Sequence, residues 1–174
     1  MGNLNETPSA NRLHIGIYGK TNSGKSSLIN AVTKQEVSIV ADVAGTTTDP
    51  VYKPMEIHPL GPCVIIDTAG FDDDSELGER RVEKTHLAAE KTDIAVVVLD
   101  IAEVIAAKKA GVPFKKAFKD EAEWSLLFAK KHTPVVFALN KIDEILLSAE
   151  AQEKSSGKLD NAAIEAAKCW VYEE

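Results

Sequence analysis

The residues best suited to chemistry form one glycine-rich segment, Gly19-Lys20-Thr21-Asn22-Ser23-Gly24-Lys25-Ser26. Its spacing is G-x-x-x-x-G-K-S, in which glycines let backbone N–H groups wrap around phosphate oxygens. A lysine at this spacing reaches the terminal phosphates, and the hydroxyl that follows it is a ligand for Mg²⁺. We therefore expect a phosphate-binding loop. Its nucleotide contacts are expected at Gly19, Asn22, Ser23, Gly24, Lys25, Ser26 and Ser27.

A second motif, Asp67-Thr68-Ala69-Gly70, directly follows the apolar run 63–66. A carboxylate at the end of a buried strand can join the ligands of Mg²⁺, and Gly70 can bring its backbone N–H close to a γ-phosphate. By itself D-x-x-G is a weak pattern, because a helix-capping aspartate followed by a turn glycine is common. Downstream of a phosphate-binding loop, the motif predicts that Ser26 and Asp67 share one Mg²⁺ ion.

A third motif, Asn140-Lys141-Ile142-Asp143, follows the apolar segment 134–139. The Asp143 carboxylate can accept hydrogen bonds from N1–H and the 2-amino group of guanine, an edge that adenine lacks. A site built for these hydrogen bonds rejects the base that cannot make them. We therefore predict that Asn140, Lys141 and Asp143 contact the base and that the ligand is GTP or GDP. An ATPase or kinase that uses the same loop is disfavoured.

The elements that must position these motifs are indicated by apolar runs and helical spacing. Strands are expected at 13–18, 51–57, 63–67, 94–99 and 134–139, with a last strand at 169–172. Helices are expected at 25–33, 75–91, 120–131 and 160–168. Residues 34–50 are expected to form a long loop, and residues 103–118 form either a helix that ends at Gly111-Val112-Pro113 or an insertion.

Strands that alternate with helices predict a mostly parallel sheet covered on both faces. A hairpin at 60–62 would add a single antiparallel edge strand. The predicted fold class is α/β, a three-layer sandwich of the P-loop NTPase type. A polar arm over 1–12 is expected to precede a GTP-binding domain over 13–174.

Composition restricts the classes of partner. The net charge of −7 speaks against a nucleic-acid-binding surface or a basic membrane-binding face. No apolar run approaches the ~20 residues that span a bilayer, and the polar first 12 residues do not suit a signal peptide. The two cysteines, Cys63 and Cys169, form no C-x-x-C pair. We expect a cytoplasmic protein.

Together, GKTNSGKS, GTTTD, DTAG and NKID resemble the TrmE–Era group of P-loop GTPases, which have a Ras-like G domain. Within that group, the segments RLHIGIYGKTNSGKSSLINA, VAGTTTDPVYKPME and ELGERRVEKT are most similar to the GTPase domains of the HydF family, which serves [FeFe]-hydrogenase maturation. The resemblance implies a slow, switch-like GTPase of an iron–sulfur maturation scaffold. It also implies pairing of two G domains and other hydrogenase maturation proteins as partners.

The resemblance assigns roles to three further positions. Thr47 matches the switch I threonine that closes on Mg²⁺ and the γ-phosphate, although Thr46 and Thr48 are adjacent alternatives. Asn22 matches an asparagine that helps to hold K⁺ beside the phosphates, where a cation stabilises developing negative charge. The alternative for Asn22 is that asparagine suits the backbone geometry of the loop.

The catalytic set implied by the resemblance is Lys25, Thr47 and Glu79. Glu79 matches the position of a catalytic glutamate in switch II, but it also suits a solvated helix face with Arg80. Phe71 stands where Ras-like proteins carry the glutamine that orients water, and phenylalanine cannot do so. Two hypotheses therefore remain: a K⁺-stimulated GTPase, and a nucleotide-dependent binding module with negligible hydrolysis.

The last guanine motif of the family, Ser-Ala-Lys or similar, is expected just beyond Tyr172. Ser148-Ala149-Glu150 resembles it by letters but follows Asp143 too closely, with no room for a helix and a strand between them. We therefore expect the sequence to stop before that motif, and before the dimerisation and cluster domains of the HydF family.

Overall fold

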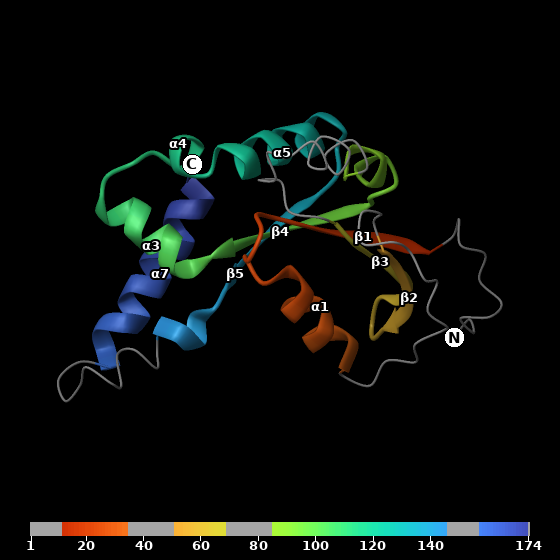
Figure 1. Ribbon diagram of the computed structural model, residues 1–174, viewed down its shortest axis with the longest axis horizontal. Helices are drawn as coiled ribbons and strands as arrows, with labels where there is room; N and C mark the ends of the chain where they lie inside the picture. Colours follow the sequence, from red (N-terminus) through yellow and green to blue (C-terminus); the bar gives the residue numbers. More distant parts are fainter. Residues whose placement is uncertain (1–11, 35–50, 69–84, 146–156, 174) are drawn as a thin grey trace.

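The computed structural model describes residues 12–34, 51–68, 85–145 and 157–173 (Figure 1). The strands are β1 (Leu13–Tyr18), β2 (Val51–Ile57), β3 (Gly61–Asp67), β4 (Ile94–Asp100) and β5 (Val135–Asn140). The helices are α1 (Lys25–Lys34), α3 (Ile101–Lys109), α4 (Phe114–Ala117), α5 (Lys119–Lys130) and α7 (Gly157–Glu173). Residues 85–90 and 142–145 are also helical.

The strands form one five-stranded sheet in the order β2-β3-β1-β4-β5. β2 and β3 are antiparallel, and the other neighbouring strands are parallel. The register pairs Ile17 with Asp67 and Asp100 with Asn140, so the carboxyl ends of β1, β3, β4 and β5 lie side by side. Ligands of open α/β sheets bind at the carboxyl ends of the strands. The predicted fold class is confirmed.

Each face of the sheet carries its own apolar core, as side chains that alternate along a strand require. On β4, Val97 and Leu99 pack into a core shared with α3, α4, α5 and α7. The intervening Val98 packs into a core with Ile29 of α1. Figure 1 shows α1 and α5 on opposite sides of the sheet, which gives the three layers.

Tyr18 anchors the end of β1, one residue before the glycine-rich segment. Its side chain is fully buried, and its hydroxyl lies 2.6 Å from Thr92 Oγ1. Its ring stacks on Trp124 of α5, with 5.5 Å between the ring centroids. Burial raises the Tyr18 pKa to about 12, although the Thr92 hydrogen bond acts in the opposite direction. The glycine-rich loop therefore begins next to a tyrosine that is fixed by packing and uncharged at neutral pH.

The strand β2 stands at one end of the sheet and contains a proline. Pro54 lies opposite Val64 of β3 in the antiparallel register. Proline has no N–H to donate, which confines it within sheets to edge strands and bulges. The predicted single antiparallel edge strand is therefore confirmed, with a residue suited to that place.

Most predicted elements are confirmed within the described residues, and β3 begins two residues earlier than predicted. The helix alternative for 103–118 is also confirmed, because α3 ends just before Gly111, whose φ of +64° suits glycine. The predicted loop 34–50 and most of the predicted helix 75–91 lie outside the described residues.

One predicted element at the end of the chain is wrong, and another strand is less buried than its apolar sequence suggests. Residues 169–172 are not a strand, because α7 continues through them and buries Ile164, Ala167 and Val171 at helical spacing. The strand predicted at 134–139 exists as β5 but is only half-buried. β5 stands at the end of the strand order, and its Val136 is 51% exposed.

None of the described helices is both long and apolar enough to cross a membrane.

Candidate functional site

The glycine-rich segment joins β1 to α1 as a tight loop, called the P-loop below (residues 19–26). Its backbone has positive φ at Gly19 (+141°), Asn22 (+62°) and Gly24 (+93°). A Cβ atom built on Gly19 would lie 2.5 Å from the carbonyl oxygen of Val98, and one on Gly24 would lie 2.0 Å from Asn140 Nδ2. Both glycines are therefore required by backbone conformation and by close approach of β4 and β5.

Gly24→Ala is expected to destabilise the protein more than Gly61→Ala does. Gly61 has a similar φ of +84°, but a Cβ there meets nothing within 4 Å. Both changes should cost about 1–2 kcal/mol of unfolding free energy for the backbone conformation. Gly24→Ala should cost about 1 kcal/mol more, because the Asn140 side chain would have to turn away and lose its hydrogen bond to the Ser23 carbonyl. Urea unfolding measures both values, and equal losses would contradict the contact with Asn140.

Lys25 begins α1 and lies inside the P-loop. Its side chain is buried, and its Nζ donates to the carbonyl oxygens of Gly19 at 2.8 Å and Lys20 at 2.6 Å. The first turn of a helix presents backbone N–H groups and the positive end of the helix dipole. An ammonium, a helix N-terminus and a glycine-rich backbone at one place form a site for phosphate groups.

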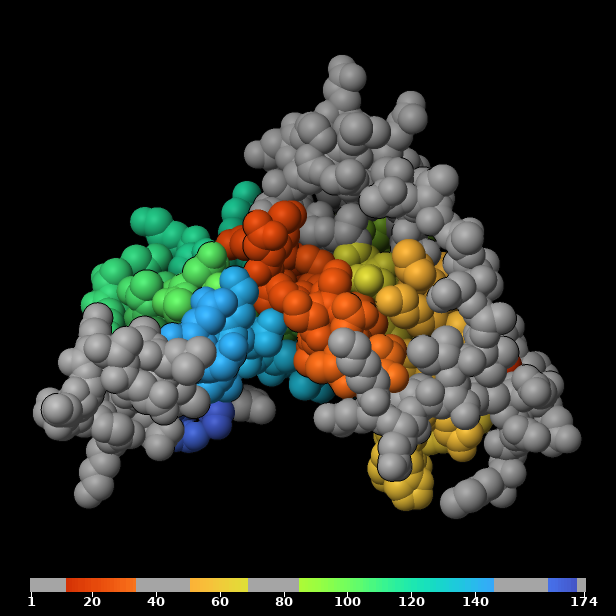
Figure 2. All heavy atoms as spheres, turned by 60° about the horizontal axis from the view of Figure 1, so that its bottom comes forward, coloured from red at the N-terminus to blue at the C-terminus, as the bar shows by residue number. Residues whose placement is uncertain are grey.

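The NKID motif (residues 140–143) contacts the P-loop directly. Asn140 Nδ2 donates to the carbonyl oxygen of Ser23 at 3.0 Å. In Figure 2, the orange P-loop and α1 lie between the yellow β2–β3 hairpin and the blue residues around β5. The structure thus brings two motifs that are far apart in the sequence into one site.

Lys141 is held by a carboxylate that the sequence analysis missed. Lys141 Nζ lies 2.8 Å from Asp100 Oδ2, and Asp100 Oδ1 accepts from the N–H of Ala102 to cap α3. Burial raises the pKa of Asp100, but the bonds from Lys141 and Ala102 outweigh it and leave the pKa below its usual value. The hydrogen bond with Asp100 raises the Lys141 pKa.

Asp143 lies in the helical turn 142–145 that follows β5, and its side chain is exposed. An exposed carboxylate is accessible to a base that arrives from solvent. Of the motif's other two polar residues, Asn140 is oriented toward the loop and Lys141 toward Asp100.

Ser26 and Asp67 offer the oxygen atoms that Mg²⁺ prefers. Asp67 ends β3, and Ser26 lies exposed in the first turn of α1. Burial raises the pKa of Asp67, while Lys53 and Lys25 act in the opposite direction. A hydroxyl and a carboxylate fit this ion, because Mg²⁺ binds through one or two protein oxygens together with water and substrate phosphates.

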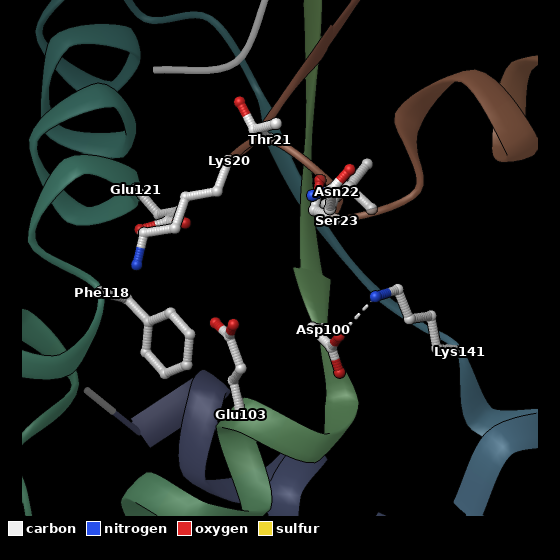
Figure 3. A pocket seen from close by; sticks show the side chains of 10 residues that line it. Lys20, Thr21, Asn22, Ser23, Asp100, Glu103, Phe118, Glu121 and Lys141 are labelled. Carbon is white, nitrogen blue, oxygen red and sulfur yellow. Dashed lines mark ion pairs between the residues drawn. The ribbon is translucent and has the colours of Figure 1, made fainter. Parts of the chain in front are cut away.

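A pocket of about 60 Å³ lies between the P-loop, the end of β4 and the α4–α5 junction (Figure 3). Polar side chains dominate its walls. It is lined by Lys20, Thr21, Asn22, Ser23, Val98, Asp100, Glu103, Phe118, Glu121 and Lys141. Burial raises the pKa of Glu121, and Lys20 acts in the opposite direction.

Three predicted site residues, Thr47, Gly70 and Glu79, lie outside the described residues. Glu121 is a site residue that the sequence analysis missed, although a signal existed. Its spacing of three and seven from Trp124 and Phe128 places it on the apolar face of α5. For Asp100, the signal was its position directly after a buried strand.

Comparison with known proteins identifies GTPases as relatives of this chain. A family model described as 50S ribosome-binding GTPase matches residues 14–141. GTPase Der of Mycoplasmopsis pulmonis is 54% identical over 65 residues, which are 37% of this chain and 15% of that protein. The tRNA modification GTPase MnmE of Laribacter hongkongensis is 34% identical over 132 residues, which are 75% of this chain and 26% of that protein. The chain thus spans about a quarter or less of these relatives.

Solved structures of Era share the fold. An Era variant of Aquifex aeolicus bound to GDP and AlF₄⁻ has a TM-score of 0.60 at 25% identity, over 92% of this chain and 48% of that chain. Era in complex with MgGDPNP and part of 16S ribosomal RNA has a TM-score of 0.55 at 28% identity, over 76% of this chain and 41% of that chain. That RNA complex weakens the expectation, based on net charge, that nucleic acid is not a partner.

The relatives named above are not hydrogenase maturation proteins, so the HydF part of the resemblance stays a prediction. The TrmE–Era part is confirmed, because the matching family model extends from β1 through the P-loop to Lys141. The chain belongs to the P-loop GTPases of the TrmE, Era and Der type, a family described as 50S ribosome-binding GTPases.

Proposed function

We propose that this G domain binds GTP and GDP between the P-loop and the NKID motif and hydrolyses GTP slowly. The observation that carries the proposal is the hydrogen bond from Asn140 Nδ2 to the Ser23 carbonyl. It joins the guanine-reading motif to the phosphate-binding loop, so base and phosphates are bound by one rigid unit. Turnover of GTP and of ATP, measured side by side with Mg²⁺ present, tests it. ATP hydrolysis at an equal rate would refute it.

In this proposal each part of the site has one task. The P-loop backbone from Gly19 to Ser27 surrounds the phosphates, and Lys25 neutralises charge that builds up on them during transfer. Ser26 and Asp67 would hold Mg²⁺, which supplies further neutralisation of phosphate charge. Thr47, Gly70 and Glu79 keep their predicted roles at the γ-phosphate and the attacking water.

We further propose that K⁺ stimulates hydrolysis through Asn22. A cation beside the phosphates is most effective in the transition state, where negative charge builds up. Asn22 is exposed and lines the pocket, and an asparagine amide oxygen is a suitable ligand for a cation (Figure 3). Its φ of +62° also suits asparagine without any cation. The two explanations predict different behaviour of variants.

Replacing Na⁺ by K⁺ at fixed ionic strength is expected to raise GTP turnover roughly tenfold in the unmodified protein. Asn22→Gly keeps the backbone conformation accessible and removes the amide, so it should lose the K⁺ response while GDP affinity changes little. Asn22→Ala should lose the response and also weaken GDP binding, because alanine disfavours this φ. Asn22→Gly that keeps full K⁺ stimulation would assign Asn22 a backbone role only.

A role in hydrogenase maturation is supported by the three sequence segments that are similar to the HydF family. Pairing of two G domains belongs to the same proposal, and K⁺ stimulation that increases with protein concentration would support it.

The second candidate function is a binding module in which GTP changes partner affinity and hydrolysis is negligible. Phe71, which cannot orient water, favours this candidate. Single-turnover hydrolysis in K⁺ that stays at the uncatalysed rate would select it.

A further inference from the structure

An ion pair between a half-buried lysine and a buried glutamate joins the P-loop to the junction of α4 and α5. Lys20 Nζ lies 3.8 Å from Glu121 Oε2 and 5.4 Å from the centroid of the Phe118 ring. Glu121 is 1% exposed and Phe118 is 2% exposed. Figure 3 shows the Lys20 side chain extending from the P-loop along the wall of the pocket toward both residues.

Glu121 is an unusual residue for its place. Within the described part of the chain, no hydrogen-bond donor lies within reach of its Oε2. A buried carboxylate is costly unless a cation lies close to it, and Lys20 is the cation that the structure places there. The start of α5 adds the favourable end of a helix dipole. The Glu121 carboxylate therefore interacts with the P-loop through the Lys20 ammonium.

Lys20 is also the residue whose backbone controls the phosphate-binding lysine. The carbonyl oxygen of Lys20 accepts from Lys25 Nζ at 2.6 Å and from the backbone N–H of Ser23 at 3.3 Å. Together with the Gly19 carbonyl, this carbonyl sets where the Lys25 ammonium lies, and its bond with Ser23 helps to fix the turn of the loop. The side chain of the same residue is fixed by Glu121 and Phe118.

We propose that Glu121 is a positioning residue for nucleotide binding, which acts through Lys20 to hold the P-loop in the conformation that receives the phosphates. This inference rests on the proposed role of residues 19–26 in binding phosphate. A loop that is already ordered loses less conformational freedom when the nucleotide binds. Loss of the ion pair therefore loosens the loop and shortens the residence time of GDP.

The test is the dissociation rate of fluorescently labelled GDP at fixed Mg²⁺ from the 174-residue chain. Glu121→Gln and Lys20→Met are each expected to accelerate release roughly three- to tenfold. The double variant should release GDP no faster than the faster single variant, because both changes remove one interaction. Glu123→Gln is the matched control. Glu123 lies on the same helix and pairs with Lys119 at 3.8 Å, but both side chains are well exposed, so no change is expected.

Two further measurements separate positioning from general stability. Lys20→Arg keeps the cation and should restore slow release, whereas a purely steric role of the side chain would not favour arginine over methionine. Urea unfolding of the nucleotide-free variants shows whether faster release merely follows lost stability. Unchanged release in both Glu121→Gln and Lys20→Met, or additive effects in the double variant, would overturn the inference. If the unmodified chain bound no GDP, the proposed function itself would fail.

Discussion

Lys25→Ala is expected to weaken GDP and GTP binding roughly 100-fold, which corresponds to about 3 kcal/mol. The Lys25 ammonium is held inside the P-loop by two backbone carbonyls, so it meets the phosphates at a fixed place and with little competition from water. Hydrogen bonds from such a charged donor to anionic oxygens are the strong ones. Isothermal titration with GDP in the presence of Mg²⁺ measures the loss.

Lys130→Ala is the control for this experiment, because Lys130 is an exposed lysine on α5 with the same charge. It should leave the affinity unchanged. Thermal unfolding of nucleotide-free Lys25→Ala must accompany the titration, since the variant also removes the donor to Gly19 and Lys20. A Lys25→Ala protein that stays folded and binds GDP as the unmodified protein does would remove the phosphate-binding role of the loop.

Asp143→Asn is expected to reduce GTP affinity about 100-fold and to raise affinity for xanthosine triphosphate. In the proposed site the carboxylate accepts two hydrogen bonds from the guanine edge, whereas an amide presents one acceptor and one donor group. Xanthine carries a carbonyl where guanine carries the 2-amino group, so it matches the amide better. Competition of the two triphosphates against labelled GDP measures the change in preference.

Asp143 is exposed, so its replacement should leave the stability of the fold nearly unchanged. Glu144→Gln changes the neighbouring exposed carboxylate and should not alter the preference. If Asp143→Asn bound GTP with full affinity, the NKID segment would not read the base, and a selective site for guanine would have to be sought elsewhere.

The motifs predicted the tight loop between β1 and α1 because they describe backbone requirements as well as chemistry. Gly19 and Gly24 are needed wherever a loop approaches β4 and β5 this closely, so their spacing already implies the fold around them. Apolar runs predicted the strands for a similar reason, since a central strand must be buried on both faces. The loop glycines and the apolar strands can be predicted because each depends on a short stretch of sequence and on its place in a single sheet.

The features that sequence reasoning missed depend on contacts between distant segments. The pair Lys20–Glu121 forms only once α5 is placed beside the P-loop, and the pair Lys141–Asp100 only once β5 aligns with β4 in the register that sets Asn140 opposite Asp100. Apolar and aromatic residues at 169–172 suggested a strand, but helical spacing of the buried Ile164, Ala167 and Val171 decided the outcome. Tertiary packing therefore overrode local β-propensity at the end of the chain.

Pro54 makes the two outer strands of the sheet, β2 and β5, unequal in their ability to pair with an additional strand. A strand from another molecule that aligned with β2 would find no N–H at that position, and the row of hydrogen bonds would be interrupted. β5 contains no proline and ends at Asn140, which donates to the P-loop. A strand that extends this sheet would pair more readily along β5. Such a partner would lie beside Asn140 and the proposed guanine-reading residues, so strand pairing and nucleotide binding would influence each other.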